Sequence, residues 1–82
     1  VHRAVPIDAL DAEVRGLVQE LGVAPTVTIG LSKWLLHAGS TTPLNEQLQN
    51  EALAMELSSR SEDFREGLGA FMEKRPPRFS GR

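Results

Sequence analysis

The segment SEDFREGLGAFMEKRPP, residues 61–77, contains the start, the apolar face and the end of one helix. Ser61 and Asp63 are both good N-cap residues, and Glu66 follows Asp63 at the spacing of a capping box. Two consecutive prolines at positions 76 and 77 cannot continue a helix. The apolar face consists of residues at helical spacing: Phe64, Leu68, Phe71 and Met72. The segment therefore predicts a helix over residues 61–74.

Three further helices are predicted upstream, at residues 8–21, 25–38 and 43–58. Asp8 is the expected N-cap of the first helix. Pro25 and Pro43 suit the first position of the second and third, because proline lacks the N–H that a helix start leaves unpaired. Each helix carries an apolar stripe at helical spacing. The members are Leu10, Val14, Leu17, Val18 and Leu21, then Val27, Leu31, Trp34, Leu35 and Ala38, then Leu44, Leu48, Ala52, Met55 and Ala54 or Leu57.

These helices predict an all-α fold, an open layer of about four helices rather than a closed bundle. Residues 1–6 alternate apolar and polar side chains as a strand does, but no partner strand follows. We interpret them as an orphan strand, the remnant of a larger unit. The whole chain, residues 1–82, is then a single helical domain with the strand remnant at 1–6, the helices within 8–75 and an extended basic tail at 76–82.

The composition excludes several classes of protein. The chain has a net charge of −2, and its first 70 residues hold 10 acidic residues against 5 Lys and Arg, so no nucleic-acid partner is expected. Without cysteine there is no disulfide scaffold, and two histidines 35 positions apart do not form a metal cluster. No apolar run approaches the roughly 20 residues of a membrane span, so we expect a soluble, cytoplasmic protein with no membrane partner.

The chain is also short for an independent fold. A domain of this size buries only about 60% of its unfolded surface, and neither a disulfide nor a metal compensates. We therefore expect the chain to lean on other residues or on further copies, as part of a homo-oligomer.

No catalytic arrangement emerges from the polar residues. Glu62, Asp63 and Glu66 crowd the start of the last helix, where a metal or acid–base site is one interpretation and capping of the helix is the favoured one. His37 stands in the last turn of its helix, where a cation suits the helix dipole. Residues 67–69 read Gly-Leu-Gly but lack the strand and third glycine of a dinucleotide-binding turn, so close packing is their expected use. We predict no catalytic residue and no metal ligand.

The basic tail is the most suggestive feature of the sequence. A ring that stacks on a base and a cation that meets a phosphate are what a nucleotide requires. A positively charged helix end that complements the dipole is the alternative. Four cations and two aromatic residues gather in this tail and in the helix end directly before it: Lys74, Arg75, Arg78, Arg82, Phe71 and Phe79.

The same region carries a resemblance to a known family. The C-terminal signature of the crotonase, or enoyl-CoA hydratase/isomerase, family resembles Ser61-x-Asp63-x-x-Glu66-Gly67-x-x-Ala70-Phe71-x-Glu73-Lys74-Arg75-x-Pro77-x-Phe79-x-Gly81. Upstream, Val1-x-Arg3-x-Val5-Pro6 resembles the last strand of that family's catalytic domain. The resemblance covers essentially the whole chain.

The resemblance implies where the chemistry lies. Family members are considerably longer, and their oxyanion hole and, in hydratases, two catalytic glutamates belong to a part that would precede position 1. Their C-terminal helices cover the active site and build trimers that pair into hexamers. The Phe and Lys of the Phe-x-Glu-Lys-Arg motif reach the adenosine end of coenzyme A, and they correspond to Phe71 and Lys74 here.

The function implied by the resemblance is that of a lyase of fatty acid metabolism. The intact enzyme would add water to 2-enoyl-CoA thioesters, with the acyl-CoA as substrate and no separate cofactor, whereas the 82 residues alone would be inactive. An enoyl-CoA isomerase would share the same signature. Two alternatives from other classes are a non-enzymatic helical interaction module and a binder of anionic ligands or nucleic acid through the tail.

Overall fold

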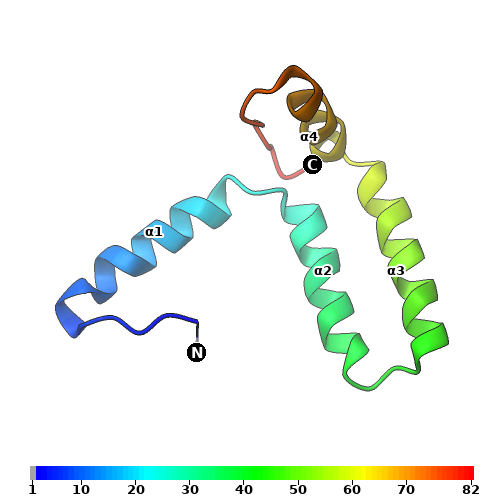
Figure 1. The fold of residues 1–82 in the computed structure, drawn as a ribbon, viewed down its shortest axis with the longest axis horizontal. Coiled ribbons are helices and arrows are strands. Elements are labelled where there is room, and N and C mark those ends of the chain that lie inside the picture. Colours follow the sequence, from blue (N-terminus) through cyan, green and yellow to red (C-terminus); the bar gives the residue numbers. More distant parts are fainter. Residues whose placement is uncertain (1) are drawn as a thin grey trace.

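Four α-helices make up the computed structural model, which describes residues 2–82 (Figure 1). A turn of 3₁₀-helix, η1 (Ile7–Ala9), leads into α1 (Leu10–Gly22). The other helices are α2 (Thr26–Gly39), α3 (Leu44–Ser59) and α4 (Glu62–Glu73). The predicted all-α class is confirmed, and each helix begins one or two residues later than its sequence pattern indicated. None of the helices in the described part is both long and apolar enough to cross a bilayer.

The helix starts show which predicted caps are real. The Ser61 hydroxyl accepts a hydrogen bond of 3.0 Å from the Phe64 N–H and confirms the cap of α4. Asp8 lies inside η1 and does not cap α1. Pro25 and Pro43 have extended ψ angles of 88° and 147°, so they stand at the N-cap, one position before the helix, and were wrongly placed inside it.

The predicted strand is not formed over residues 2–6, and Val1 lies outside the described residues. A strand needs a neighbour that pairs with its backbone N–H and C=O groups, and residues 2–82 supply none. Instead, the segment runs back beside α1, where Arg3 forms an ion pair with Glu13. The interpretation of residues 1–6 as a strand remnant stays a prediction.

The helices form an open layer, as predicted. Helices α2 and α3 lie antiparallel as a hairpin, α4 packs near the end of α3, and α1 extends away from the hairpin (Figure 1). The Cα trace measures 46 × 38 × 19 Å, which is flat. Its radius of gyration is 16.1 Å, against about 12 Å for a compact domain of this length.

Small side chains make the contacts between the helices. Ala54 and Ser58 of α3 and Ala70 of α4 are buried, and a hydrogen bond of 2.8 Å joins the hydroxyls of Thr28 in α2 and Ser58. Buried Ala and Ser let helix backbones approach closely without a large side chain between them. The hairpin is therefore held on its small and polar face.

The large apolar side chains point outward instead. Exposed residues include most of the stripe predicted for α3 and the whole stripe predicted for α4: Leu44, Leu48, Met55, Leu57, Phe64, Leu68, Phe71 and Met72. The accessible surface of 6835 Å² compares with roughly 4,900 Å² for a compact monomer of this mass. Within residues 2–82 the layer thus leaves most of its large apolar side chains uncovered.

Candidate functional site

The end of α4 is an unusual helix terminus. The Arg75 N–H donates to the Ala70 carbonyl at 3.0 Å and the Lys74 N–H donates to the Phe71 carbonyl at 3.3 Å, which is the Schellman pattern. The backbone of Lys74 itself is left-handed, with φ 55° and ψ 39°. Glycine normally takes this left-handed position, and a lysine there costs roughly 1–2 kcal/mol. Such strain is typical of functional sites and needs support from the surrounding structure.

The tail beyond Lys74 folds back along α4 and is not the free extended segment that its sequence suggested. Asp63, only 2% exposed, anchors its far end. The two carboxylate oxygens of Asp63 accept hydrogen bonds of 2.6 Å from the Ser80 N–H and 2.8 Å from the Gly81 N–H. The Asp63 N–H in turn donates to the Arg82 carbonyl at 2.8 Å. Three backbone contacts thus join the last residues of the chain to the first turn of α4.

Glu66 holds the near end of the tail. Its carboxylate accepts hydrogen bonds of 2.7 and 2.9 Å from two nitrogens of Arg75, and one of 2.7 Å from the Arg78 N–H. Hydrogen bonding to the Arg75 guanidinium, and then to the Arg78 N–H, lowers the pKa of Glu66 to about 2. The same contact raises the pKa of Arg75. The predicted capping pair of Asp63 and Glu66 is therefore wrong, because both carboxylates are engaged by residues far along the chain.

Two glycines accommodate the returning tail. Gly67 faces the Phe79 ring, and a Cβ at this position would stand in ordinary contact, 3.5 Å from it. The expected close packing at Gly67 is thus against the tail rather than another helix. Gly81 has φ 80°, and a Cβ there would come within 2.9 Å of the Thr26 hydroxyl oxygen. That hydroxyl donates to the Gly81 carbonyl at 3.4 Å, which links the tail to the start of α2.

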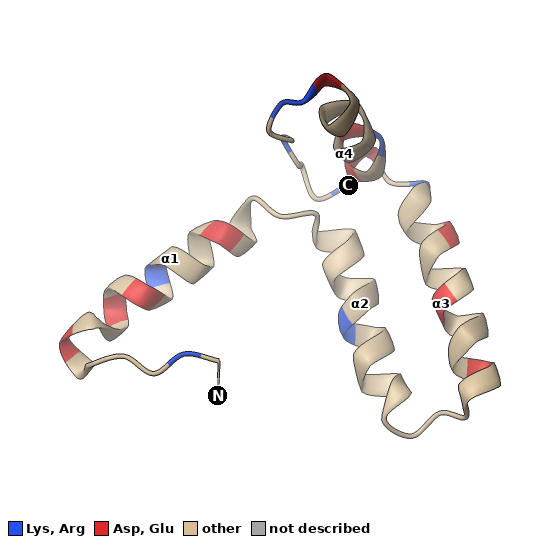
Figure 2. Cartoon of the chain, in the orientation of Figure 1, with Lys and Arg blue, Asp and Glu red and all other residues tan. Residues whose placement is uncertain are grey.

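The four cations of the tail differ in their surroundings. Arg75 is paired with Glu66 and, at 2.6 Å, with Glu73. The Arg82 guanidinium lies 4.0 Å from Glu62. Lys74 and Arg78 form no ion pair with any residue that the structure describes. Figure 2 shows the charged positions of the tail gathered around α4, while acidic residues are spread over α1 and α3. Two of the four cations, Arg75 and Arg82, are therefore partly neutralised by carboxylates of α4.

Of the two residues predicted to contact a nucleotide, Phe71 lies in the last turn of α4 and Lys74 directly follows the helix. Phe71 is 82% exposed, and Lys74 is exposed as well. Phe79, by contrast, is half-buried against Gly67. The structure therefore leaves one ring, and one ammonium that pairs with none of residues 2–82, open to solvent at the same helix end.

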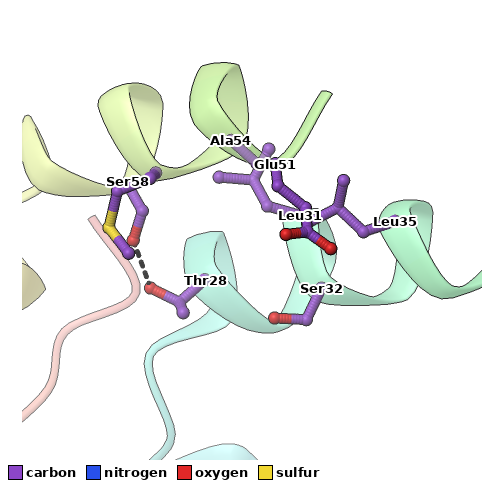
Figure 3. Close-up of a pocket in the computed structure, with 8 residues that line it drawn as sticks. Thr28, Leu31, Ser32, Leu35, Glu51, Ala54 and Ser58 are labelled. Carbon is purple, nitrogen blue, oxygen red and sulfur yellow. Dashed lines mark hydrogen bonds between the residues drawn. The ribbon is translucent and has the colours of Figure 1, made fainter. Parts of the chain in front are cut away.

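A hollow that sequence reasoning did not identify lies between α2 and α3. Figure 3 shows it bridged at one side by the hydrogen bond between Thr28 and Ser58, with Glu51 reaching over it from α3. Among the described residues that line it, Glu51 is the one ionisable side chain. The lining residues are Thr28, Leu31, Ser32, Leu35, Glu51, Ala54, Met55 and Ser58. One carboxylate among aliphatic and hydroxyl groups offers no acid–base pair.

The family model for enoyl-CoA hydratase/isomerase matches residues 1–82. A probable enoyl-CoA hydratase of Rhodobacter capsulatus is 39% identical over 82 residues, and 1,2-epoxyphenylacetyl-CoA isomerase of Escherichia coli is 34% identical over the same length. Among solved structures, enoyl-CoA hydratase subunit I of Geobacillus kaustophilus superposes on the whole chain with a TM-score of 0.94 at 36% identity. A second enoyl-CoA hydratase structure from that organism gives 0.91 at 33% identity.

The chain belongs to the enoyl-CoA hydratase/isomerase family, as its signature residues indicated. This is a family of enzymes, and its fold contains the helical layer seen here. The chain spans 32% and 31% of the two curated relatives, and 32% and 31% of the two solved chains. The remaining two-thirds of those proteins have no counterpart in residues 1–82.

Proposed function

We propose that these 82 residues are the C-terminal helical part of an enzyme that adds water to 2-enoyl-CoA thioesters. The observation that carries the proposal is the match of the whole chain to the family, together with a relative of 39% identity described as a probable enoyl-CoA hydratase. In such a reaction an oxyanion hole polarises the thioester carbonyl and carboxylates deliver the water.

The chain's own carboxylates do not suit that chemistry. Asp63 and Glu66 are saturated by the tail, and Glu51 stands alone over the hollow between α2 and α3. We therefore assign this layer a role in binding and assembly. The isolated 82 residues are expected to give no loss of enoyl-CoA absorbance above the uncatalysed rate. Turnover that survives repurification would contradict this assignment.

Phe71 and Lys74 are the proposed contacts to coenzyme A. The exposed Phe71 ring can flank an adenine, and the unpaired Lys74 ammonium can meet a phosphate. The left-handed backbone of Lys74 supports the assignment, because a lysine that serves only as a helix end would be replaced there by glycine at a gain in stability. We thus propose that binding of coenzyme A by the Lys74 ammonium explains why lysine, and not glycine, stands at this strained position.

The exposed apolar faces support a further part of the proposal, that the layer packs against the rest of the enzyme and against other subunits. Its accessible surface of 6835 Å² exceeds that of a compact monomer by about 2,000 Å². A standard protein interface buries about 800 Å² of each partner, so the excess is large enough for more than one such interface. A homo-oligomer, a trimer or a hexamer, is the proposed assembly.

The test of the ligand contact is Lys74→Ala in the full-length protein, assayed with a CoA thioester and with a truncated pantetheine thioester. The contact is distant from the reacting carbon and equal in ground and transition states, so KM for the CoA thioester should rise while kcat holds. The loss corresponds to about 1–3 kcal/mol. Arg82→Ala removes an equal charge from the same tail and serves as the control. An equal loss with both thioesters would make Lys74 purely structural.

A second candidate reaction is isomerisation of a CoA thioester. The relative from Escherichia coli is described as 1,2-epoxyphenylacetyl-CoA isomerase and is 34% identical over the whole chain. Incubation of the full-length protein with a 2-enoyl-CoA in H₂¹⁸O separates the two reactions. Hydration places the label in a 3-hydroxyacyl product, whereas isomerisation yields a product without it. A non-enzymatic interaction module would give neither product.

A further inference from the structure

The ion pair between Glu66 and Arg75 joins the middle of α4 to the residue that directly follows Lys74. The Arg75 guanidinium is held on two sides, by both oxygens of Glu66 and by Glu73 at 2.6 Å. A bidentate pair between arginine and a carboxylate fixes direction as well as distance. The backbone on the far side of Lys74 therefore has a defined position relative to the helix.

Contacts further along the tail also hold it against α4. Glu66 also accepts the Arg78 N–H at 2.7 Å, and Asp63 accepts the N–H groups of Ser80 and Gly81. Asp63 and Glu66 are three positions apart, one helical turn, so they act from the same side of α4. The segment of residues 75–82 is thus pinned near both of its ends.

A strained residue keeps its conformation only where its surroundings impose it. Lys74 is such a residue, with φ 55°, and its own side chain makes no ion pair or hydrogen bond within residues 2–82 that would hold it there. The contacts that impose the bend come from Glu66, Arg75 and Asp63. Arg75 also pairs with the two nearby carboxylates, those of Glu66 and Glu73, and the Lys74 ammonium has no ion-pair partner among residues 2–82.

We propose that Glu66 and Arg75, supported by Asp63, are positioning residues that hold Lys74 in its left-handed bend beside Phe71, so that ring and ammonium meet one ligand. The inference rests on the proposed function, in which that ligand is coenzyme A. Neither Glu66 nor Arg75 needs to touch the ligand. Their role is to keep the bend populated before the ligand arrives, which removes an ordering cost from binding.

The experiment compares Glu66→Gln with Glu62→Gln in the full-length protein. Both variants remove one negative charge from the first half of α4, but Glu62 lies only at 4.0 Å from Arg82 and holds no backbone group of the tail. Glu66→Gln should raise KM for a CoA thioester about tenfold, the scale of one charge-assisted hydrogen bond. Its kcat, and its KM for a pantetheine thioester, should match those of Glu62→Gln.

A second variant and a direct structural measurement distinguish the positioning role from simple misfolding of the Glu66→Gln protein. Arg75→Lys keeps the charge and loses the fork, so it should reproduce the effect on KM for the CoA thioester. Amide hydrogen exchange at Arg78 should quicken in Glu66→Gln and remain slow in Glu62→Gln. An Arg78 amide that stays protected, or a KM for the CoA thioester equal to that of Glu62→Gln, overturns the positioning role.

The wild-type protein separates this inference from the proposed function. If the wild type shows the same KM for CoA and pantetheine thioesters, the coenzyme A contact itself fails, and the positioning role fails with it. If the wild type prefers the CoA thioester but Glu66→Gln keeps that preference, the positioning role alone is overturned.

Discussion

Glu66 and Arg75, nine residues apart, form a bidentate ion pair in which the two carboxylate oxygens accept hydrogen bonds of 2.7 and 2.9 Å from the guanidinium. The pair spans the left-handed bend at Lys74, where the chain turns back at the end of α4. It also neutralises one of the four cations at positions 74–82. The basic tail is therefore folded against α4, and of the four cations at positions 74–82 only Lys74 and Arg78 have no ion pair among the described residues.

The hold of Glu66 on the tail should depend on pH. Its pKa is about 2 in the folded state, against 4.5 as the ordinary value, because Arg75 and the Arg78 N–H stabilise the charged form. Between these values the unfolded state binds more protons, so this stabilisation is complete above about pH 4.5 and is lost as the pH falls through about 2. We expect the amide resonance of Arg78 to titrate with a midpoint near the lower value. A midpoint near 4.5, or a titration that persists in Glu66→Gln, would contradict the assignment.

Gly81→Ala should release the end of the tail. Its φ of 80° disfavours any residue with a Cβ, and the added atom would stand 2.9 Å from the Thr26 hydroxyl oxygen. The free energy of unfolding of the full-length protein should fall by about 1–2 kcal/mol. Gly30→Ala is the matched control, since nothing lies within 4 Å of its Cβ position and helix propensity favours alanine there. Equal effects of the two substitutions in denaturant unfolding would show that the tail tolerates a side chain at position 81.

Lys74→Gly should separate stability from ligand binding. Glycine accepts the left-handed conformation without strain, so the variant should gain roughly 1 kcal/mol in unfolding free energy. It also lacks the ammonium, so its affinity for a CoA thioester should fall as in Lys74→Ala. The two variants should therefore differ in thermal stability but not in KM. A Lys74→Gly protein that is less stable than wild type would mean that the lysine side chain supports the fold.

The isolated 82 residues should associate with one another. Trp34 is 43% exposed and Leu36 80% exposed on α2. All five residues of the apolar stripe of α1 are exposed as well: Leu10, Val14, Leu17, Val18 and Leu21. Large exposed apolar patches promote association in water. Light scattering at millimolar concentration should report a dimer or trimer. A monomer with a cooperative melt would show that the helices close on themselves in solution.

Much of the local structure could be predicted from single segments of sequence. Helix spans follow from apolar periodicity and from Gly and Pro, which are local properties, so all four helices were placed to within two residues. The Ser61 cap was predicted for the same reason, because its partner, the Phe64 N–H, is three residues away. The family signature in residues 61–81 is equally local, and it identified the family without any structure.

Other features depended on contacts between distant parts of the chain. Periodicity shows that Phe64, Leu68 and Phe71 share a face, but not whether anything covers that face, and here Ala70 is buried while Phe71 is exposed. Asp63 and Glu66 have the spacing of a capping pair, yet their partners are 12 to 18 residues away for the tail backbone and nine for Arg75.

The left-handed bend at Lys74 is the clearest case of a feature that only the tertiary structure decided. A local rule would put glycine at that position, and the sequence offers lysine. The bend persists because the tail is fastened to α4 on the far side of it, through residues that no short window contains. Sequence alone therefore determined where the helices lie and which family they belong to. Tertiary contacts decided which side chains remain exposed for a partner. A strained backbone and an exposed face both depend on contacts with residues that are distant in the sequence.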